Sequence, residues 1–538
     1  MRWWGWGDDA HAFALPEAAL HLLRSELGIQ PGEGRGPVAL EDVRMPAAAL
    51  PAAARQALTG AVGEEHVRDD RLSRVRHAAG RSYPDLVRLR AGEAEAAPDA
   101  VVEPGSAAAV AAVLEVCSEH GVAVVPFGGG TSVVGGVEPI RDGFGSVVSL
   151  DLRRLDRLLE LDATSLLARL EPGLLGPAAE GELARQGLTL GHFPQSFEFS
   201  TVGGWVATRS AGQASTGYGR IDELVEGTVL CTPAGVVGAK ARPASAAGPA
   251  LRELIVGSEG VLGVICEATV RVRPAPEERR YEGWSFQSFE EGVEALRVME
   301  QAGASPDVAR LADEEETRLS LAMASTGSAG ERAGRAYLRL RGHEGGCLAI
   351  AGWEGDPDDV ARRRLRGAAL LRAGGGLALG SRPGRAWERS RYAAPYLRDE
   401  LLGHGVLVET LETACSWSRL HDLHAAVRAA LRKALGSPIV MCHVSHLYPS
   451  GASLYFTFLA RSRDGAELEQ WRAAKAAATD AIVAGGGTIT HHHAVGRDHA
   501  PWMAAEVGEL GVELLRAAKE RLDPAGIMNP GKLLPPKS

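Results

Sequence analysis

Apolar residues in the first half of the chain form short runs and one helical repeat. "DAVVEP" has the length and composition of a short strand, and it precedes an apolar-periodic segment over residues 107–120. Ser106 and Gly121 flank that segment as an N-cap and a terminating glycine, so it is predicted to be a helix. "VAVVPF" then reads as a buried strand that runs directly into "GGGTSVVGG". The order predicts an α/β unit.

Three more strand-like runs follow, and one helix leads from them into a long strand. The runs are "VVSLDL", "LLELD" and "SLLARLEPG", and the helix is predicted over "LLGPAAEGELARQ". "GSEGVLGVICEATVRVRP" closes the region with a glycine-punctuated turn and a long alternating strand. Before this region, residues 1–95 read as an Ala-rich, mostly helical lead-in with breaks such as "QPGEGRGP".

The pattern changes after "PAPEERRYEG", which places a domain boundary near residue 275. Long amphipathic helices between isolated strands are predicted there, in "SFEEGVEALRVMEQAG", "DDVARRRLRGAALLRAGGG" and "SWSRLHDLHAAVRAALRKALG". The long strand "ASLYFTFLARS" precedes another helix and a run of histidines. "AAKERLDPAGIMNPGKLLP" predicts a helix that ends in a Pro/Gly-rich tail folding back on the protein.

Length and composition exclude several classes of protein for this chain. A chain of 538 residues is expected to divide into two or more domains, and 45% hydrophobic residues suffice for a buried core. The net charge of -10 argues against a nucleic-acid binder. The six cysteines never form a C-x-x-C pair, which argues against a disulfide framework or zinc ribbon and favours a reducing cytoplasm. No apolar run approaches the roughly 18 residues of a membrane span.

The N-terminus "MRWWGWGDDAHAF" lacks the apolar core of a signal peptide. Its three tryptophans have two interpretations. They rest on a membrane interface, or they pack as an N-terminal arm on the domain.

Glycine clusters are the first chemical signal. "PFGGGTS" follows a buried strand, and its bare backbone either cradles an anion or makes a tight turn. "STVGGWVATRSAG" and "GSEGVLG" add two clusters beside strands. Neither the Walker A pattern nor the dinucleotide G-x-G-x-x-G pattern is present. Three clusters in one α/β region favour a long ligand, such as a dinucleotide, lying against bare backbone.

The run "TITHHHAVGRDHAPW" has three interpretations: a contact with substrate or cofactor, a metal site, or a structural turn. Adjacent histidines point in different directions on a strand or a helix, whereas a compact metal site suits alternating or i,i+4 spacing. His492 and Arg497, five residues apart around Gly496, suit an anion pocket better. We therefore predict no metal.

Several of these motifs together carry a resemblance to a known family. "VVPFGGGTSVVGG", "GHFPQSFEFSTVGGWVATRSAG" and "GSEGVLGVICEATVRVRP" resemble the FAD-binding domain of vanillyl-alcohol oxidase type flavoproteins. "WWGWG", "VETLETACSW", "HHHAVGRDH" and "ASLYFTF" are similar to the alkyldihydroxyacetonephosphate synthase branch. The resemblance runs from end to end of the chain.

The resemblance implies a fold and a division of the chain. It implies an α+β fold, with a two-subdomain FAD-binding domain of the PCMH type and an α/β cap domain that contains an antiparallel sheet. Residues 1–95 would form the helical arm, 96–275 the FAD-binding domain, 276–485 the substrate cap, and 486–538 a segment returning to the active site.

The same resemblance implies which residues bind FAD. The pyrophosphate loop would use Pro126, Gly128, Gly129, Gly130, Thr131 and Ser132; the flavin ring region, Ser200, Thr201, Gly204 and Trp205; and the adenosine side, Glu259, Gly260, Gly263 and Val264. Covalent relatives often carry a histidine just after the glycines. Thr131 stands there in this chain, so FAD is expected to be bound non-covalently.

Catalytic and substrate-binding residues are implied in the same way. The catalytic set is Tyr455 as general acid/base, with His192, His491, His492 and His493; the substrate set is Arg398, Arg310, Thr410 and Arg497. Without the resemblance, a strand tyrosine, a lone histidine and the arginines would be read as packing, core and ion-pair residues. Gln195 stands where the family has an aspartate, and "QAST" replaces a basic pair, which puts the substrate in doubt.

The resemblance implies an enzyme that exchanges the acyl group of acyl-dihydroxyacetone phosphate for a fatty alcohol, with FAD as an electrophile and no net redox change. The alternative is an FAD-dependent 2-hydroxyacid or alcohol dehydrogenase or oxidase on the same scaffold. The expected partners are lipid substrates and no nucleic acid. Peripheral membrane contact and a homodimer are left open, and the expected location is the cytoplasm.

Overall fold

The first sheet begins as the hydrophobic pattern predicts. The computed structural model describes residues 1–8, 14–30, 32–324 and 328–536. Four strands pair in the order β1-β2-β4-β3: β1 (Val67–Arg68), β2 (Ala100–Val102), β4 (Ser146–Asp151) and β3 (Val122–Phe127). Helix α5 (Ala107–His120) joins β2 to β3; Ser106 caps it by accepting from the Ala109 N–H, and Gly121 ends it at a φ of +62°. The predicted strand, helix and strand are confirmed.

A second sheet of five antiparallel strands follows. Its order is β5 (Leu158–Asp162), β6 (Leu167–Leu170), β10 (Val264–Arg271), β8 (Val225–Thr232) and β9 (Gly235–Ala239). A small pair joins β7 (Leu188–Thr189) to β11 (Arg273–Pro274). The helices of this region are α6 (Gly176–Ala184), α7 (Val202–Thr208), α8 (Ser215–Tyr218), α9 (Ile221–Leu224) and α10 (Leu251–Ile255). Strands β5, β6 and β10 and helix α6 confirm the pattern read from the sequence.

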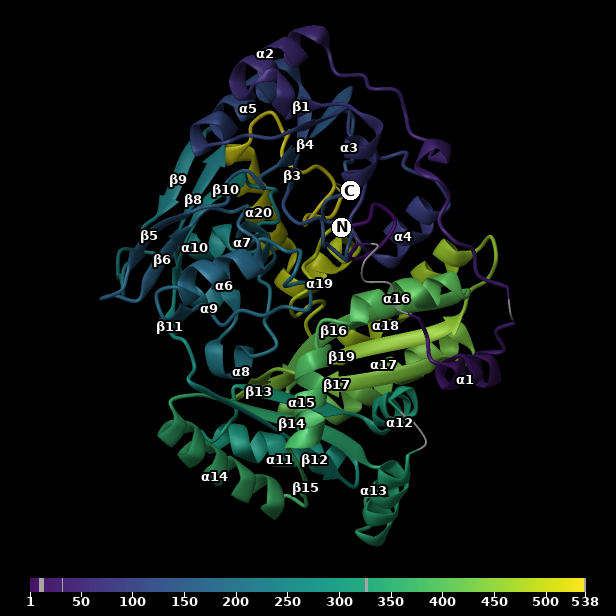
Figure 1. Cartoon of the computed structure of the whole chain (residues 1–538). Helices are drawn as coiled ribbons and strands as arrows, with labels where there is room; N and C mark the ends of the chain where they lie inside the picture. Colours follow the sequence, from purple (N-terminus) through teal and green to yellow (C-terminus); the bar gives the residue numbers. More distant parts are fainter. Residues whose placement is uncertain (9–13, 31, 325–327, 537–538) are drawn as a thin grey trace.

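The strands after residue 275, which helices separate along the sequence, form one continuous sheet, and the antiparallel cap sheet implied by the resemblance is confirmed. Seven strands pair antiparallel in the order β15 (Leu377–Gly380), β12 (Glu278–Phe286), β14 (Cys347–Gly355), β13 (Val308–Ala312), β17 (Ile439–Val444), β19 (Gly451–Arg461) and β16 (Val406–Ser416), and β18 (Leu447–Tyr448) adds to β19. Neighbours in this sheet are far apart in sequence, which a local pattern does not reveal. Figure 1 shows this sheet below the glycine-rich region.

Helices accompany the large sheet throughout its length. They are α11 (Phe289–Gln301), α12 (Glu314–Met323), α13 (Ala329–Leu340), α14 (Pro357–Ala373), α15 (Ser381–Ser390), α16 (Ala394–Gly403), the short η4 (Trp417–Arg419), α17 (Leu420–Leu435) and α18 (Glu467–Ala484). The long predicted helices correspond to α11, α14, α17 and α18. Their apolar stripes share one buried core with the strands.

Strand β19 separates an apolar face from a polar face. Leu454, Phe456 and Phe458 are buried in the core that α17 and α18 share with the sheet. Because side chains alternate along a strand, Tyr455 and Thr457 belong to the opposite face. The sheet therefore presents Tyr455 away from the helix-covered core.

The N-terminal arm packs along both halves of the molecule. It contains α1 (Glu17–Leu27), η2 (Leu40–Asp42), α2 (Ala52–Val62), η3 (Glu64–His66), α3 (Arg71–Arg76) and α4 (Tyr83–Arg90). Trp3 and Trp6 are 9% and 3% exposed, which supports the interpretation that these two side chains pack on the protein, and peripheral membrane contact stays a prediction. No helix within the described residues has the length and apolar character needed to cross a bilayer.

The end of the chain folds back, as its sequence predicts. After η5 (Ala500–Trp502), α19 (Met503–Val507) and α20 (Glu509–Leu522), the tail reaches strand β3. The Asn529 N–H donates to the Val124 carbonyl at 2.8 Å, and Met528 forms a parallel bridge with Val124. The Leu533 N–H donates to the Gly496 carbonyl at 2.9 Å. The tail thereby joins β3 to the histidine-containing segment.

Candidate active site

The three glycine clusters meet around strand β3. A Cβ on Gly128 would strike the Thr201 hydroxyl, and a Cβ on Gly129 would strike the Phe199 carbonyl. Gly260 has a φ of +74° and would place a Cβ 2.9 Å from the ring of Pro126. Glycine is therefore required where these segments touch. The convergence that the sequence suggested for a long ligand is present.

The loop after β3 presents unpaired backbone donors. Among the described residues, no hydrogen bond is found from the amides of Gly129, Gly130 or Thr131 to a protein acceptor. Ser132 closes the loop, because its hydroxyl accepts from the Gly136 N–H at 2.9 Å. Adjacent free amides on bare backbone bind phosphate oxygens well. The loop therefore fits the diphosphate of a dinucleotide.

A second group of predicted cofactor residues forms the wall beside this loop. Thr201 caps α7 by accepting from the Gly204 N–H at 3.3 Å, and Ser200 accepts from the indole of Trp205 at 2.7 Å. His192 lies 4.9 Å from the Trp205 ring, and its Nε2 is 3.0 Å from the Ser210 hydroxyl. Its Nδ1 has no partner within the described part of the chain, and burial lowers the pKa of His192 to about 3. This neutral imidazole has a nitrogen left for a ligand.

Glu259 ties the third glycine cluster to the histidine segment. Its carboxylate accepts from the amides of Val495 at 2.8 Å and Gly496 at 2.7 Å. Burial raises the pKa of Glu259 to about 7. The Glu259 carboxylate, which the resemblance assigned to the adenosine side, therefore binds backbone amides of the protein. Gly263 and Val264 lie at the start of β10, where a Cβ on Gly263 would meet the Cys231 carbonyl at 2.5 Å.

Three polar side chains lie in one row across the large sheet. His443 on β17 and Glu412 on β16 both stand opposite Tyr455 in the strand register. The rings of His443 and Tyr455 stack with centroids 4.9 Å apart. Burial raises the pKa of Tyr455 to about 12, against the effect of a hydrogen bond from Thr410. The phenol is therefore protonated at neutral pH.

Glu412 anchors the histidine loop. Its buried carboxylate accepts from the backbone amides of His491 at 2.5 Å, His492 at 3.1 Å and His493 at 2.8 Å. It also accepts from the Thr490 hydroxyl at 2.7 Å. Although burial opposes ionisation, these hydrogen bonds hold the pKa of Glu412 well below its usual value. One carboxylate therefore holds the whole turn beside Tyr455.

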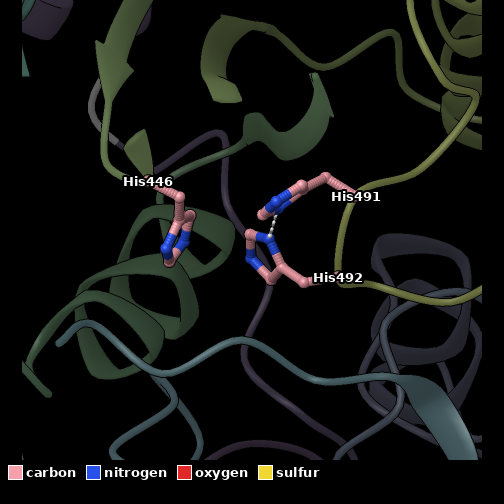
Figure 2. Close-up of side chains that lie close together, drawn as sticks. All are labelled: His446, His491 and His492. Atoms are coloured by element: carbon pink, nitrogen blue, oxygen red, sulfur yellow. Dashed lines mark hydrogen bonds between the residues drawn. The ribbon is translucent and has the colours of Figure 1, made fainter. Parts of the chain in front are cut away.

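The loop brings three predicted catalytic histidines to the tyrosine. The ring centroids of His492 and His493 lie 5.9 Å and 5.5 Å from that of Tyr455. His491 and His492 share a contact between their Nδ1 atoms at 3.0 Å, and His446 faces them (Figure 2). Burial lowers the pKa of all four imidazoles, which are therefore neutral at pH 7.

The nitrogens of His446, His491 and His492 lie within 4.8 Å of one another, a spacing from which a metal site can be built. A proton held between the two Nδ1 atoms accounts for the 3.0 Å contact without an ion. The absence of a metal stays a prediction. Elemental analysis of the purified protein checks it, and a stoichiometric zinc or iron content would contradict it.

Arg398 is placed to receive an anion. It lies on α16, and its Nη1 donates to the Arg81 carbonyl at 2.7 Å. Its buried Nε and Nη2 have no hydrogen-bond partner among the described residues, although Asp399 lies 3.7 Å from Nη2. The Arg81 N–H in turn donates to the Ser132 carbonyl at 2.6 Å. The Arg81 backbone thus connects Arg398 to the cofactor loop, and two guanidinium nitrogens remain without a hydrogen-bond partner among the described residues.

The other predicted substrate residues have different surroundings. Arg310 is held by Glu316 at 2.5 Å and His443 at 3.0 Å, so its guanidinium is already paired. Thr410 contacts the phenol of Tyr455. The side chain of Arg497 is half-exposed and pairs with Glu138 at 2.7 Å. The described contacts of Arg497 do not include the histidines or Tyr455.

The sequence did not identify Glu412, His443, His446 or Tyr448 as parts of this site. Two glutamates inside the mostly buried strand "VLVETLETACS" were a usable signal, because a buried acid needs partners. "MCHVSHLY" likewise places two histidines and a tyrosine at the end of an apolar strand. Their meeting with the histidine loop depends on strand register, which the sequence does not show.

Non-covalent binding of FAD leads to a direct test. Acid precipitation of the purified protein is expected to leave all of the yellow flavin in the supernatant, because the cradle around Thr131 offers no histidine for a bond to the ring. Absorbance of the supernatant and pellet measures this. Flavin that stays in the washed pellet would show a covalent link.

The comparisons with known proteins agree with this geometry. A model described as "FAD binding domain" matches residues 98–238, and one described as "FAD linked oxidases, C-terminal domain" matches residues 275–533. These matches support FAD as the cofactor and confirm the implied fold class, with its FAD-binding half and its antiparallel cap sheet.

Relatives at higher similarity share the whole length. Alkyldihydroxyacetonephosphate synthase of Dictyostelium discoideum is 34% identical over 99% of this chain and 93% of its own. The enzyme of the same name from Trypanosoma brucei brucei is 33% identical over 99% and 92%. A solved alkyldihydroxyacetonephosphate synthase superposes with a TM-score of 0.85 at 30% identity, covering 99% of both chains. The chain therefore belongs to the alkyldihydroxyacetonephosphate synthase family of FAD-dependent enzymes.

Proposed function

We propose that this enzyme exchanges the acyl group of an acyl-dihydroxyacetone phosphate for a long-chain alcohol, giving an alkyl ether. The observation that carries the proposal is the position of the Tyr455 phenol, which lies between His443 and the loop of His492 and His493. General acid/base groups lie in this way beside a reacting carbon or oxygen. The relatives named for this synthesis support the assignment.

Each group has a separate task in the proposal. Bound FAD supplies an electrophilic ring, so the exchange needs no net change of redox state. Tyr455 moves the proton at substrate C1, and the histidines beside it take and return protons. The free Nε and Nη2 of Arg398 hold the phosphate, which suits the planar fork of a guanidinium.

Product analysis tests the proposal. The FAD-loaded enzyme is incubated with palmitoyl-dihydroxyacetone phosphate and hexadecanol, and the lipids are analysed by mass spectrometry. Ether product and released palmitate in equal amounts support it. Absence of ether, combined with anaerobic bleaching of the flavin by a 2-hydroxyacid, would instead assign the enzyme to the dehydrogenases.

Replacing Arg398 by lysine is expected to raise the KM for the phosphate substrate about tenfold, corresponding to about 1.4 kcal/mol, because a lysine cannot offer two parallel donors. Steady-state kinetics at fixed alcohol concentration measures the change. Arg364→Lys is the matched control, since Arg364 pairs with Glu282 at 2.6 Å in the cap. An unchanged KM in Arg398→Lys would contradict the phosphate role.

The location in a reducing cytoplasm stays part of the proposal. The six cysteines are buried and unpaired in the part of the chain that the structure describes, which suits a compartment that keeps thiols reduced. The substrates proposed here are lipids, so fractionation of cells into cytosol and membranes tests the location directly.

A further inference from the structure

Two residues that the sequence did not assign to the site, Tyr448 and Arg220, form a chain of polar contacts that begins at His491. Tyr448 on β18 places its hydroxyl 2.6 Å from Nε2 of His491. Arg220, just before α9, contacts the same hydroxyl. The guanidinium is itself fixed, because its Nε donates to Asp222 at 3.0 Å and its Nη2 to the Arg209 carbonyl at 3.1 Å. A rigid cation thus ends a chain of polar groups that leads to His492.

The direction of the hydrogen bonds along this chain follows from their chemistry. A guanidinium has no acceptor, so Arg220 donates to the phenol oxygen of Tyr448. The phenol hydrogen then needs an acceptor, and Nε2 of His491 is the one that the described contacts provide. An Nε2 that accepts leaves neutral His491 with its proton on Nδ1. That proton points to Nδ1 of His492, 3.0 Å away.

The tautomer of His492 is fixed as a result. Its Nδ1 accepts, so its own proton is on Nε2. Figure 2 shows the second ring nitrogen of His492 on the side of His446. His446 is held separately, with Nδ1 2.5 Å from the Ser215 hydroxyl. Every imidazole of the cluster therefore has a polar partner that sets its orientation, as second-sphere groups do in other sites.

We propose that Tyr448, held by Arg220, is a positioning residue that fixes the tautomers of His491 and His492, so that His492 presents its Nε2–H to the substrate. This inference rests on the proposed acyl-for-alkyl exchange. The acyl group leaves as a carboxylate, and the Nε2–H of His492 donates a hydrogen bond to its oxygen, which stabilises the negative charge.

The incoming alcohol completes the exchange. It loses its hydroxyl proton as its oxygen forms the ether bond, and the released carboxylate takes up that proton. Tyr448 remains a protonated phenol throughout, because burial raises its pKa to about 12. One ester and one alcohol give one ether and one carboxylic acid. The protons balance, and no oxidant or reductant is needed.

The tautomers can be measured without any assay of activity. In FAD-loaded protein with 15N-labelled histidine, the His491 signals are expected to show a protonated Nδ1 and a bare Nε2, and those of His492 the reverse. His491→Asn and His492→Asn assign the signals. The opposite pattern in the wild-type protein would overturn the proposal, whether or not ether is formed.

Tyr448→Phe tests the functional consequence. The hydrogen bond to His491 is lost, so we expect kcat to fall about thirtyfold with KM and FAD content unchanged, less than the full effect of a direct acid/base group. The His491 pattern is expected to become a mixture of tautomers. Arg220→Lys keeps a cationic donor and is expected to retain most of the activity.

Tyr83→Phe is the matched control, since this buried phenol has only a 3.4 Å contact with Ser462. It is expected to leave kcat and the histidine signals unchanged. A Tyr448→Phe enzyme with normal kcat would refute the catalytic effect of this positioning. A wild-type enzyme that makes no ether would refute the proposed function, and the tautomer measurement would still decide the positioning role.

Discussion

Tyr455→Phe is expected to lower kcat for ether formation by about 10³-fold, within the range that general acid/base groups contribute. Phenylalanine keeps the ring that stacks on His443 at 4.9 Å and loses only the hydroxyl. Binding of substrate and cofactor should therefore change little. The variant is compared with the wild-type enzyme by initial rates over the full substrate range, with FAD content measured by absorbance.

The structure gives this expectation two further supports. The phenol lies between Glu412 and His443 in the polar row of the sheet, and neither neighbour has a hydroxyl that could replace it. The histidines beside it are neutral, so none is already charged to act as a strong acid. The control Tyr83→Phe should behave as the wild type. A Tyr455→Phe enzyme with full activity would move the proton transfer to another residue.

Glu412→Gln is expected to abolish activity and to lower the free energy of unfolding by about 3 kcal/mol, the usual cost of breaking a buried charged network. One carboxylate oxygen accepts the His492 and His493 amides, and the other accepts the His491 amide. Glutamine would place an N–H₂ against one of these N–H donors. Thermal unfolding and initial rates measure the two effects.

Glu409→Gln provides the matched control on the same strand. Its carboxylate is also buried, but it faces the other side and accepts from the Trp471 indole at 2.5 Å. We expect this variant to lose stability and to keep its kcat per bound FAD. Equal activity losses in both variants would show that Glu412 acts through general stability and not through the histidine loop.

The dependence of stability on pH follows from the same carboxylate. The pKa of Glu412 in the folded protein is below its usual value of about 4.3, so its contribution is fully present above that value. It is lost as the pH falls toward the folded-state pKa. The stability of the Glu412→Gln protein should therefore decline less steeply in acid than that of the wild type.

Much of the fold could be predicted from short-range patterns in the sequence. Ser106 and Gly121 fix α5 through capping, and the alternation in "ASLYFTF" fixes which face of β19 carries Tyr455. The glycine clusters were identified from their local density of glycine, although the contact that excludes a Cβ at Gly129 is with the distant Phe199. Each identification depends on residues near one another in the chain.

Long-range pairing was beyond the sequence pattern. The contact of Glu412 with the His491 amide spans 79 positions and depends on where β16 and the loop meet. The pairing of Arg310 with Glu316 and His443 uses donors that the resemblance had assigned to a phosphate. The side chain of Arg497, the residue after Gly496, donates to Glu138. Strand register and side-chain direction determine these contacts, and the local amino-acid composition reveals neither of them.

The tail that joins β3 through Asn529 has a bearing on biosynthesis. The ribosome makes this segment some four hundred codons after the glycine loop that it borders. A nascent polypeptide can pair β2, β3 and β4 early, but its cradle for the flavin lacks one wall until residues 524–533 have been made. Chains that stop before Asn529 would consequently lack that wall, and we expect them to emerge colourless.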